Sequence, residues 1–342
     1  MTRDPASVPS LPSDHERELT RAVSLLRGAG SVLLLAHNHP DADSLGSAIA
    51  LGLALRARGA RAWVSFDHPD EVPQSLSGLP GIDLVTPAAD WLDGSRSTEL
   101  DLIVTLDAGS TERLGRLSSL FDGSTPVLVI DHHISNTYFG DDHLVAPDVD
   151  ATVVLIEELL AALDVALDGD LAALLYAGLA TDTGGFRHGS AASHRLAARL
   201  MDAGVQPSRL MRPITEGHPF GWMQMLSQVL GRSELDPAAA GGRGLVHTCV
   251  TTEDLRGLRQ EEADSVIDIL RTSSEAAAAA VVKQSGPADW QVSLRSRDGV
   301  RVGDAAIALG GGGHPEAAGF GWQGDYHGAV AALIAALGPA VN

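Results

Sequence analysis

The sequence contains a single cysteine, Cys249, among 342 residues. One cysteine excludes a disulfide framework and a cysteine-rich zinc site. Basic residues are also scarce, with 24 Lys and Arg against 44 Asp and Glu, and the formal net charge is −20. Because each phosphate contact requires a local cation, this balance argues against a protein that grips long nucleic acid on an extended basic face. Short phosphorylated ligands remain compatible with it if bound metal ions reverse the local charge.

Long hydrophobic runs are absent too. No segment approaches the roughly 18 consecutive apolar residues of a membrane helix, and residues 1–14 lack the apolar centre of a signal peptide. We expect residues 1–14 to be a disordered tail, and we expect a cytoplasmic protein without membrane contact. Hydrophobic residues make up 44% of the chain, which is typical of a globular protein, and the length is sufficient for two domains.

Short apolar stretches alternate with helical patterns in residues 15–190. The run SVLLLA at 31–36 is bounded by Gly30 and by polar residues, which is typical of a strand buried on both faces. Further strands are expected at 61–66, 102–106 and 127–130, with helices at 15–27, 44–58, 151–163 and 171–181. This alternation predicts an α/β domain built on a parallel sheet.

The character of the chain changes after residue 190. A helical stretch and several prolines in residues 191–230 indicate a helical linker between domains. Residues 231–342 contain their own apolar strands, at 245–250, 277–283 and 290–295, and their own helices, at 263–271 and 327–337. We therefore expect a smaller C-terminal α/β domain after the linker.

Histidines and aspartates follow the predicted strands of the first domain. They are His37, Asp41 and Asp43 after the first strand, Asp107 after the strand at 102–106, and Asp131, His132 and His133 at the end of the next strand. Asp182 stands at a predicted helix end. Each cluster alone has an ordinary interpretation, such as a helix cap, a helix stop or a chance pair of histidines.

Taken together, these clusters indicate a metal centre. The carboxyl ends of parallel strands meet at one edge of a sheet. We therefore expect six side chains to converge there: His37, Asp41, Asp43, Asp107, His132 and Asp182. Nitrogen and oxygen ligands without sulfur suit two ions of Mn²⁺ or Mg²⁺ better than structural zinc. Paired ions about 3.5–4 Å apart support phosphoryl hydrolysis.

The second domain carries a candidate phosphate site. Arg295 and Arg297 stand two residues apart on a predicted strand and would share one face. Downstream, four consecutive glycines, residues 310–313, precede His314. Exposed amides of a glycine run next to His314 could cradle a phosphate group, and the alternative is a flexible linker.

These motifs, in this order, resemble the DHH phosphoesterase superfamily with its C-terminal DHH-associated domain. The matching segments are HNHPDADSLGS at 37–47, Asp107, DHH at 131–133, TDTGGF at 181–186 and GGGGHPEAAG at 310–319. The sequence is most similar to the branch of bifunctional oligoribonucleases and PAP phosphatases, the NrnA-like proteins. The resemblance implies an active site in the cleft between the two domains and a homodimer.

The resemblance also implies a role for each candidate residue. One Mn²⁺ would be held by His37, Asp41 and Asp107, and a second by Asp43, Asp107, His132 and Asp182, with Asp107 bridging. His133 would face the scissile phosphate, and Asp131 would orient the histidines. Arg295, His314 and the amides of Gly311, Gly312 and Gly313 would bind a terminal phosphate or nucleotide.

The function expected on this basis is a Mn²⁺-dependent phosphoesterase with two substrates. It would hydrolyse short RNA to mononucleotides and remove the 3′-phosphate of adenosine 3′,5′-bisphosphate (pAp), without acting on long duplex nucleic acid. A phosphodiesterase for cyclic di-AMP or linear pApA is the nearest alternative. RecJ-like exonucleases and inorganic pyrophosphatases share similar motifs, and a nucleotide-binding regulator without catalysis is an alternative from another class.

Overall fold

The computed structural model describes residues 13–93 and 99–338, so the expected tail at residues 1–14 lies almost wholly outside the described residues. The chain divides into two compact units, with the boundary between Thr215 and Glu216. This boundary falls inside the range 191–230 that we expected to connect two domains. Within the described residues, no helix has both the length and the apolar character needed to cross a lipid bilayer.

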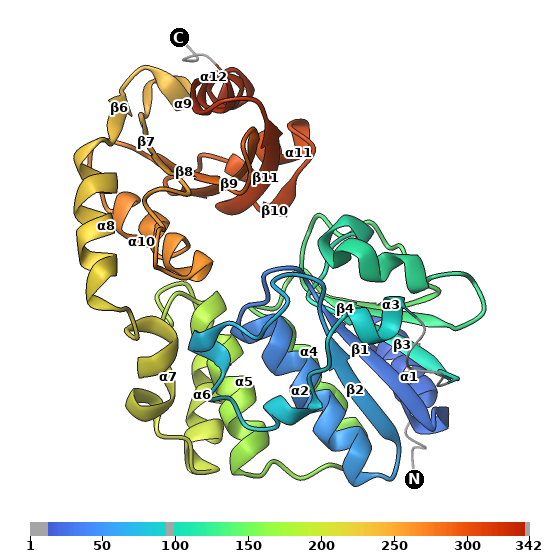
Figure 1. Ribbon diagram of the computed structural model, residues 1–342. Helices are drawn as coiled ribbons and strands as arrows, with labels where there is room; N and C mark the ends of the chain where they lie inside the picture. The colour runs from blue at the N-terminus through green and yellow to red at the C-terminus, as the bar shows by residue number, and fades with distance from the viewer. Residues whose placement is uncertain (1–12, 94–98, 339–342) are drawn as a thin grey trace, which may run out of the picture. The chain divides into compact units, whose positions relative to one another are not determined.

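The first unit is built on a parallel sheet of five strands in the order β2-β1-β3-β4-β5 (Figure 1). The strands are β1 (Ser31–Ala36), β2 (Arg61–Ser65), β3 (Leu102–Leu106), β4 (Val127–Asp131) and β5 (Asp142–Val145). The helices are α1 (Asp14–Gly28), α2 (Ala42–Ala57), α3 (Ala89–Leu92), α4 (Thr152–Ala162), α5 (Gly169–Asp182), α6 (Ala191–Asp202) and α7 (Pro207–Thr215). The predicted parallel α/β architecture is confirmed.

Both faces of this sheet are covered. Along β1, Val32 and Leu34 enter the core that includes residues of α1, α2, α4 and α5. Leu33 and Leu35 enter a second core, which includes Trp91 of α3. Because successive side chains of a strand point to opposite faces, burial on both faces requires the unbroken apolar run that the sequence shows.

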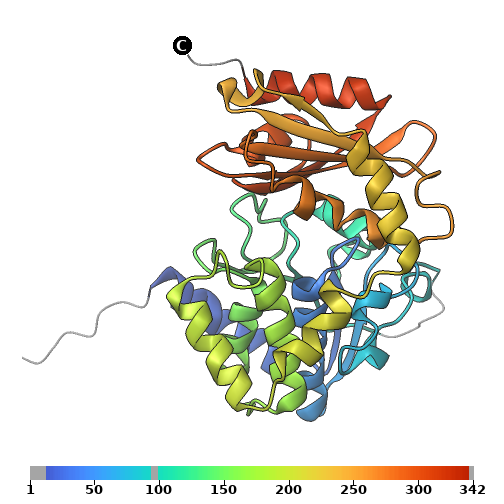
Figure 2. The ribbon, with the colours of Figure 1, turned by 90° about the vertical axis from the view of Figure 1, so that its left-hand side faces the viewer.

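The helices on the larger face form successive layers. Helices α2 and α4 pack directly on the strands, α5 packs on α2 and α4, and α6 packs on α5 (Figures 1 and 2). Glycine allows the close approach of α2 and α5, since a Cβ on Gly46 would lie 3.0 Å from the carbonyl oxygen of Leu174. The opposite face carries α3 and the 3₁₀ segment η3 (Thr111–Leu120).

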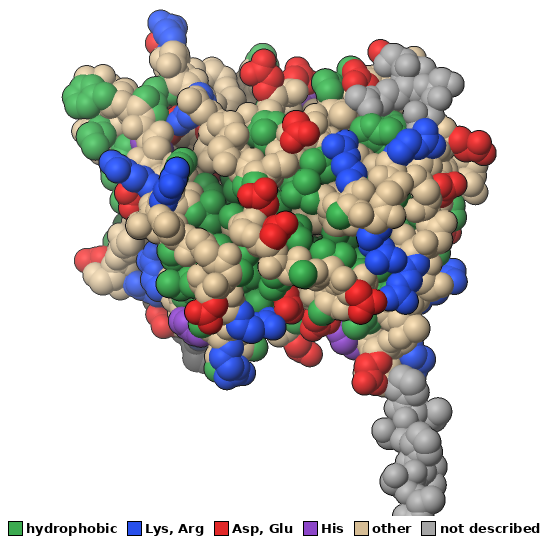
Figure 3. Space-filling view, turned by 90° about the horizontal axis from the view of Figure 1, so that it is seen from below, with side chains coloured by type: hydrophobic (Ala, Val, Ile, Leu, Met, Phe, Trp, Pro, Cys, Tyr) green, Lys and Arg blue, Asp and Glu red, His purple; other side chains and the backbone are tan. Residues whose placement is uncertain are grey.

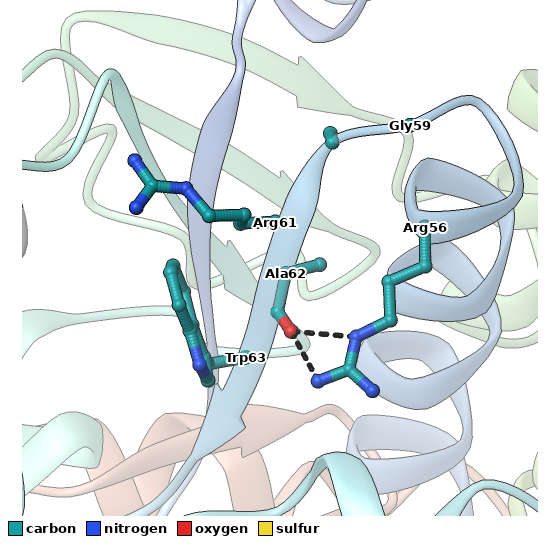
Figure 4. Close-up of a pocket in the computed structure, with 6 residues that line it drawn as sticks. Arg56, Gly59, Arg61, Ala62 and Trp63 are labelled. Atoms are coloured by element: carbon teal, nitrogen blue, oxygen red, sulfur yellow. Dashed lines mark hydrogen bonds between the residues drawn. The ribbon is translucent and has the colours of Figure 1, made fainter.

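Strand β2 is an edge of the sheet, and hydrogen bonds from other segments satisfy some of its carbonyls. Arg56 on α2 donates from Nε and Nη2 to the carbonyl oxygen of Ala62, at 3.0 and 2.8 Å (Figure 4). The backbone N–H of Thr86 donates to the carbonyl of Val64. Exposed strand edges are templates for pairing with other chains, so these contacts protect β2.

The second unit contains a mixed sheet of six strands in the order β10-β11-β9-β8-β7-β6, in which only β7 and β8 run parallel. The strands are β6 (Glu234–Asp236), β7 (Leu245–Val250), β8 (Ala278–Gln284), β9 (Asp289–Ser296), β10 (Gly312–His314) and β11 (Ala317–Gln323). The helices are α8 (Phe220–Gly231), α9 (Ala239–Gly242), α10 (Val266–Leu270), α11 (Val302–Ala308) and α12 (Tyr326–Leu337). Helices α11 and α12 cover one face of this sheet, and α8 and α10 cover the other (Figure 2).

The glycine run at 310–313 is part of a tight hairpin in this unit. A Cβ on Gly311 would overlap the carbonyl oxygen of Gly319, and a Cβ on Gly313 would lie 2.5 Å from that of Ala317. The N–H of Gly311 donates to the carbonyl of Ala306 at 2.8 Å, which ends α11. The run is therefore structured, not a flexible linker, and close strand packing requires its glycines.

Candidate metal centre

The carboxyl ends of three neighbouring strands bring the predicted residues of the first unit together. Strand β1 lies beside β3 with Ala36 opposite Leu106, and β3 lies beside β4 with Leu106 opposite Ile130. The chain leaves β1 for β2 on one side of the sheet and returns to β3 on the other. Such a switch point is where open α/β sheets bind ligands. His37 and Asp107 directly follow the two strands that flank it.

The loop after β1 is fixed by backbone hydrogen bonds. The N–H of Asn38 donates to the carbonyl of Arg113 at 2.7 Å, and the N–H of His39 donates to the carbonyl of His68 at 2.6 Å. Asp41 then caps α2, where its Oδ1 accepts the N–H of Ser44 at 2.9 Å. This geometry leaves the other oxygen of Asp41, Oδ2, 3.6 Å from His37 Nε2.

Asp107 lies between two histidines. Its Oδ2 is 3.4 Å from Nε2 of His37, and its Oδ1 is 3.4 Å from Nε2 of His132. The residue is almost fully buried and has a φ of +58°, in the left-handed region that non-glycine residues seldom adopt. Backbone strain of this kind concentrates at functional sites. One carboxylate thus presents a different oxygen to each side of the cluster.

A second group forms around His132. Its Nδ1 lies 3.2 Å from the carbonyl of Val149, and its Nε2 lies 3.1 Å from Asp182 Oδ2 and 3.9 Å from Asp43 Oδ2. Asp182 comes from the last turn of α5. A carboxylate at a helix C-terminus is unfavourable next to the negative end of the helix dipole. A nearby cation would relieve that repulsion.

Asp43 is completely buried and is held from two sides. Its Oδ2 accepts the N–H of Thr152 at 2.7 Å, and its Oδ1 accepts the N–H of Val153 at 2.9 Å. On the other side, Gly178 of α5 packs so closely that a Cβ there would lie 2.9 Å from Asp43 Oδ1. The position of this carboxylate is therefore set by α4 and α5 together.

His133 and Asp131 form a hydrogen-bonded pair next to this cluster. Nδ1 of His133 lies 2.8 Å from Asp131 Oδ1, and the amide nitrogen of Asn136 donates to Asp131 Oδ2 at 2.6 Å. Asp131 is the last residue of β4 and is fully buried. Both of its oxygens thus serve to orient neighbouring side chains.

The cluster contains more carboxylates than basic groups, and this excess of negative charge shifts the pKa values of its members. Burial raises the pKa of Asp43 well above its usual value, and the carboxylates of Asp182 and Asp107 raise it further. Burial, with the charges of Asp41 and Asp107, raises the pKa of Asp182 to about 6. For His132, burial alone would lower the pKa, but hydrogen bonds with Asp107 and Asp182 raise it to about 12.

The pKa of His37 is raised, like that of His132. Burial and the nearby charge of Arg113 lower its pKa, but the carboxylates of Asp41 and Asp107 outweigh them and raise it to about 9. The surrounding carboxylates therefore favour positive charge at these buried histidines. A metal cation bound among the same nitrogens and oxygens would balance the same charge.

The donor atoms fall into two groups that could each hold an ion. His37, Asp41 and Asp107 offer ligand atoms within 4.8 Å of one another, and so do Asp43, His132 and Asp182. Asp107 Oδ1 also borders the second group, through its approach to His132. The structure thus brings the six predicted ligands together in two neighbouring groups, and their chemistry, imidazole and carboxylate, fits Mn²⁺ or Mg²⁺.

In the second unit, Arg295 and His314 lie in one row across the sheet. Arg295 on β9 is opposite Ala317 on β11, and Ala317 is opposite His314 on β10. Paired residues of adjacent strands share a face, so Arg295 and His314 flank a small alanine and their Cα atoms are about 10 Å apart. Arg297 differs from expectation, because β9 ends at Ser296 and the guanidinium of Arg297 donates to the carbonyl of Ser273.

Two residues of the first site were not predicted from the sequence. Thr152 donates from Oγ1 to Asp107 Oδ1 at 2.8 Å, and Asn136 donates to Asp131 as described. Asn136 follows the DHH segment by three residues, and this closeness to the motif was the signal available in the sequence. Thr152 stands at the first turn of an ordinary apolar helix, where the sequence carries no such signal.

Comparison with known proteins decides the family. The model of the DHH family, N-terminal domain, matches residues 31–179, and that of the DHHA1 domain matches residues 247–339. A bifunctional oligoribonuclease and PAP phosphatase NrnA of Thermus thermophilus is 30% identical over 293 residues, which cover 85% of this chain and 83% of the relative. The chain is a DHH-family phosphoesterase. The resemblance noted in the sequence is thereby confirmed, and the protein is a hydrolase of phosphoester bonds.

Other relatives of this DHH phosphoesterase agree with the assignment. A probable NrnA of Streptococcus mutans is 22% identical over 86% of this chain and 90% of the relative. Among solved structures, an exopolyphosphatase-related protein of Bacteroides fragilis has a TM-score of 0.80 at 20% identity, covering 94% of this chain and 95% of that one. RecJ of Thermus thermophilus, solved with Mn²⁺, has a TM-score of 0.50 at 17% identity over 97% of this chain and 56% of RecJ. These two structures share the fold.

Proposed function

We propose that this DHH phosphoesterase depends on two Mn²⁺ ions, hydrolyses oligoribonucleotides of two to four residues to mononucleotides, and removes the 3′-phosphate of pAp. The observation that carries the proposal is the pair of ligand groups at the strand ends, where Asp107 belongs to one group and lies 3.4 Å from His132 of the other. The substrates follow from the names of the relatives from Thermus thermophilus and Streptococcus mutans.

In this proposal, the first ion is held by His37, Asp41 and Asp107. The second is held by Asp43, His132 and Asp182 together with Asp107. When bound, such a pair of ions polarises a phosphoryl oxygen and lowers the pKa of water. Imidazole and carboxylate ligands suit Mn²⁺, and Mg²⁺ is the other ion to test.

His133 has the properties of a proton donor to the substrate. Burial lowers its pKa, but its hydrogen bond with Asp131 and the nearby charge of Asp107 outweigh burial and raise the pKa above its usual value. Because Asp131 engages Nδ1, a proton on Nε2 would be the one directed to a phosphoryl oxygen. A positioned imidazolium stabilises negative charge that develops on phosphate during hydrolysis.

The second unit would recognise the substrate. Arg295 and His314 lie in one row of the sheet, so both can contact the oxygens of one phosphate or of two neighbouring groups. The amides of Gly312 and Gly313 are adjacent to His314 on β10. The amide of Gly311 is already used to end α11, so its contribution would be to shape the hairpin.

Charge limits the substrate to short strands. A net charge of −20 leaves little basic surface for the exit groove that a long strand needs. On the face in Figure 3, the described Arg and Lys side chains are interspersed with Asp and Glu. We therefore expect kcat/KM on single-stranded RNA to fall steeply beyond about five nucleotides, and duplex RNA to resist cleavage.

Four substrates assayed in parallel test the proposal. Initial rates with Mn²⁺ would be measured on pAp, a diribonucleotide, linear pApA and cyclic di-AMP, with Asp107→Asn prepared identically to reveal any contaminating nuclease. Turnover of pAp and the dinucleotides by the wild type alone supports the proposal. A marked preference for cyclic di-AMP would move the function to a cyclic dinucleotide phosphodiesterase, and binding without turnover would indicate a regulator.

A length series completes the assay. RNAs of two to 24 nucleotides with a 5′ label would be compared at fixed Mn²⁺ and salt. Equal efficiency on the dimer and the 24-mer would contradict the proposed length limit and favour a RecJ-like activity. The family resemblance also supports a homodimer, which sedimentation equilibrium of the same preparation would detect.

A further inference from the structure

Thr152 occupies an unusual place at the start of α4. The residue before it, Ala151, is the N-cap and has no side chain that could accept a hydrogen bond from the helix. The first amides of a helix need acceptors, because no earlier turn supplies carbonyls for them. Asp43, from a different helix, accepts those of Thr152 and Val153 at 2.7 and 2.9 Å.

The hydroxyl of Thr152 makes a second contact to the same cluster. Oγ1 donates to Asp107 Oδ1 at 2.8 Å, and the residue is fully buried. Threonine hydroxyls near a helix start commonly bond to the backbone of their own helix. Here the hydroxyl reaches a carboxylate 45 positions earlier in the sequence instead. Thr152 therefore touches Asp43 through its backbone and Asp107 through its side chain.

These two carboxylates belong to different parts of the proposed metal centre. Asp43 belongs to the ligand group with His132 and Asp182, and Asp107 belongs to the group with His37 and Asp41. The oxygen of Asp107 that receives the hydroxyl is Oδ1, which faces His132. The contact thus fixes the rotation of the Asp107 carboxylate, and with it the oxygen presented to each histidine.

We propose that Thr152 is a positioning residue, which holds the carboxylate of Asp107 in a fixed orientation relative to Asp43. Binding of both ions of the centre then depends on the Thr152 hydroxyl. This inference rests on the proposed two-metal site. Residues that orient metal ligands typically contribute about 10- to 100-fold to metal affinity or activity. Thr152 would act through Asp107 and would touch neither ion nor substrate.

The test compares substitutions that keep or remove the hydroxyl. Thr152→Val keeps the shape and the backbone contact to Asp43, and Thr152→Ser keeps the hydroxyl. Thr248→Val is a matched control, because Thr248 is a fully buried threonine whose hydroxyl donates to the carbonyl of Val229 in the second unit. Calorimetric titration with Mn²⁺ gives stoichiometry and affinity independently of turnover, and kcat is measured on pAp.

We expect the wild-type chain to bind two Mn²⁺ ions. For Thr152→Val we expect the Kd for Mn²⁺ to rise about 10-fold or more and kcat to fall by a similar factor. For Thr152→Ser we expect both values to stay within about threefold of wild type. Thr248→Val is expected to lose stability without change in Kd. If Thr152→Val does not fold, Thr152→Ala is measured in the same way. Wild-type Mn²⁺ binding and turnover in the hydroxyl-free variant would overturn the role of Thr152 alone. A wild-type chain that binds no divalent cation would overturn the two-metal site as well.

Discussion

Asp131 and His133 stand two residues apart and are joined by a hydrogen bond of 2.8 Å between Oδ1 and Nδ1. The carboxylate raises the pKa of the imidazole, against the effect of burial. Its second oxygen accepts the side-chain amide of Asn136, so the pair is held rigidly at the end of β4. The link makes the protonation of His133 dependent on a residue that need not touch substrate.

Asp131→Asn is therefore expected to lower kcat about 10- to 100-fold. Without the carboxylate, the pKa of His133 falls, so less imidazolium is present at a given pH, and the alkaline limb of the pH profile of kcat moves to lower pH. Rates on pAp between pH 5 and 10 measure both effects. Asp142→Asn, at a surface ion pair with Arg21, is the control. An unshifted profile with wild-type kcat would refute the orienting role.

Arg295→Ala and His314→Ala are expected to weaken nucleotide binding without loss of metal. A charge-assisted hydrogen bond contributes about 1.5–3 kcal/mol, which corresponds to a rise of about 10- to 150-fold in KM for pAp. Arg301→Ala is a control in the same unit, because Arg301 pairs with Asp304 on the surface. Metal content by mass spectrometry must stay at the wild-type level; a fall matching that of Asp43→Ala would show that the assignment is wrong.

Asp67→Asn is expected to lower the free energy of unfolding by about 1–3 kcal/mol at pH 7. Asp67 is buried and accepts the backbone N–H and Nε of Arg116 at 2.7 and 2.8 Å. Although burial raises the pKa of this carboxyl, these bonds lower it below the usual value. The stabilisation is therefore complete above the unfolded pKa and is lost as pH falls through the lower folded value.

Urea midpoints of wild type and Asp67→Asn between pH 7 and 3.5 measure this dependence. The difference between the two proteins should narrow below about pH 4, where the unfolded carboxyl takes up its proton. A difference that stays constant over the whole range would mean that the charge of Asp67 does not contribute.

Gly178→Ala is expected to weaken metal binding, although Gly178 is far in the sequence from Asp43, the ligand that it contacts. Its Cβ would lie 2.7 Å from Val153 Cγ1 and 2.9 Å from Asp43 Oδ1, so α5 or Asp43 must move. Overpacking of this kind costs about 1–3 kcal/mol of stability. Gly169→Ala, at the start of the same helix, has only the carbonyl of Ala203 at 3.9 Å and is the control. Equal Mn²⁺ affinity in the two variants would contradict this account of how Asp43 is held.

The parallel sheet could be predicted because its central strands β1, β3 and β4 are buried on both faces. They appear in the sequence as apolar runs next to His or Asp, and the strand-end rule then places His37, Asp107 and Asp131 at one edge. Strand β5 was not predicted, since it is a short edge strand that begins with Asp142 and His143. Edge strands need no unbroken apolar run.

The supporting contacts of the site could not be predicted in this way. Thr152 contacts Asp43 and Asp107 because α4 begins next to these residues, and such long-range packing leaves no local pattern in the sequence. The glycines at 310–313 were predicted to cradle a phosphate, and the sequence does not distinguish such a cradle from a tight hairpin. The close contact of Gly311 with Gly319 shows the hairpin.

The most direct test of a shared two-metal centre is the Mn²⁺ stoichiometry and turnover of Asp107→Asn beside the wild type. The change is nearly isosteric, so folding is expected to survive, while removal of the charge that faces both His37 and His132 should abolish turnover on every substrate. The account predicts two ions in the wild type and less than a hundredth of its kcat in the variant. Retention of more than about a tenth of wild-type activity, which corresponds to a rise of under ~1.4 kcal/mol in the activation barrier, would contradict it.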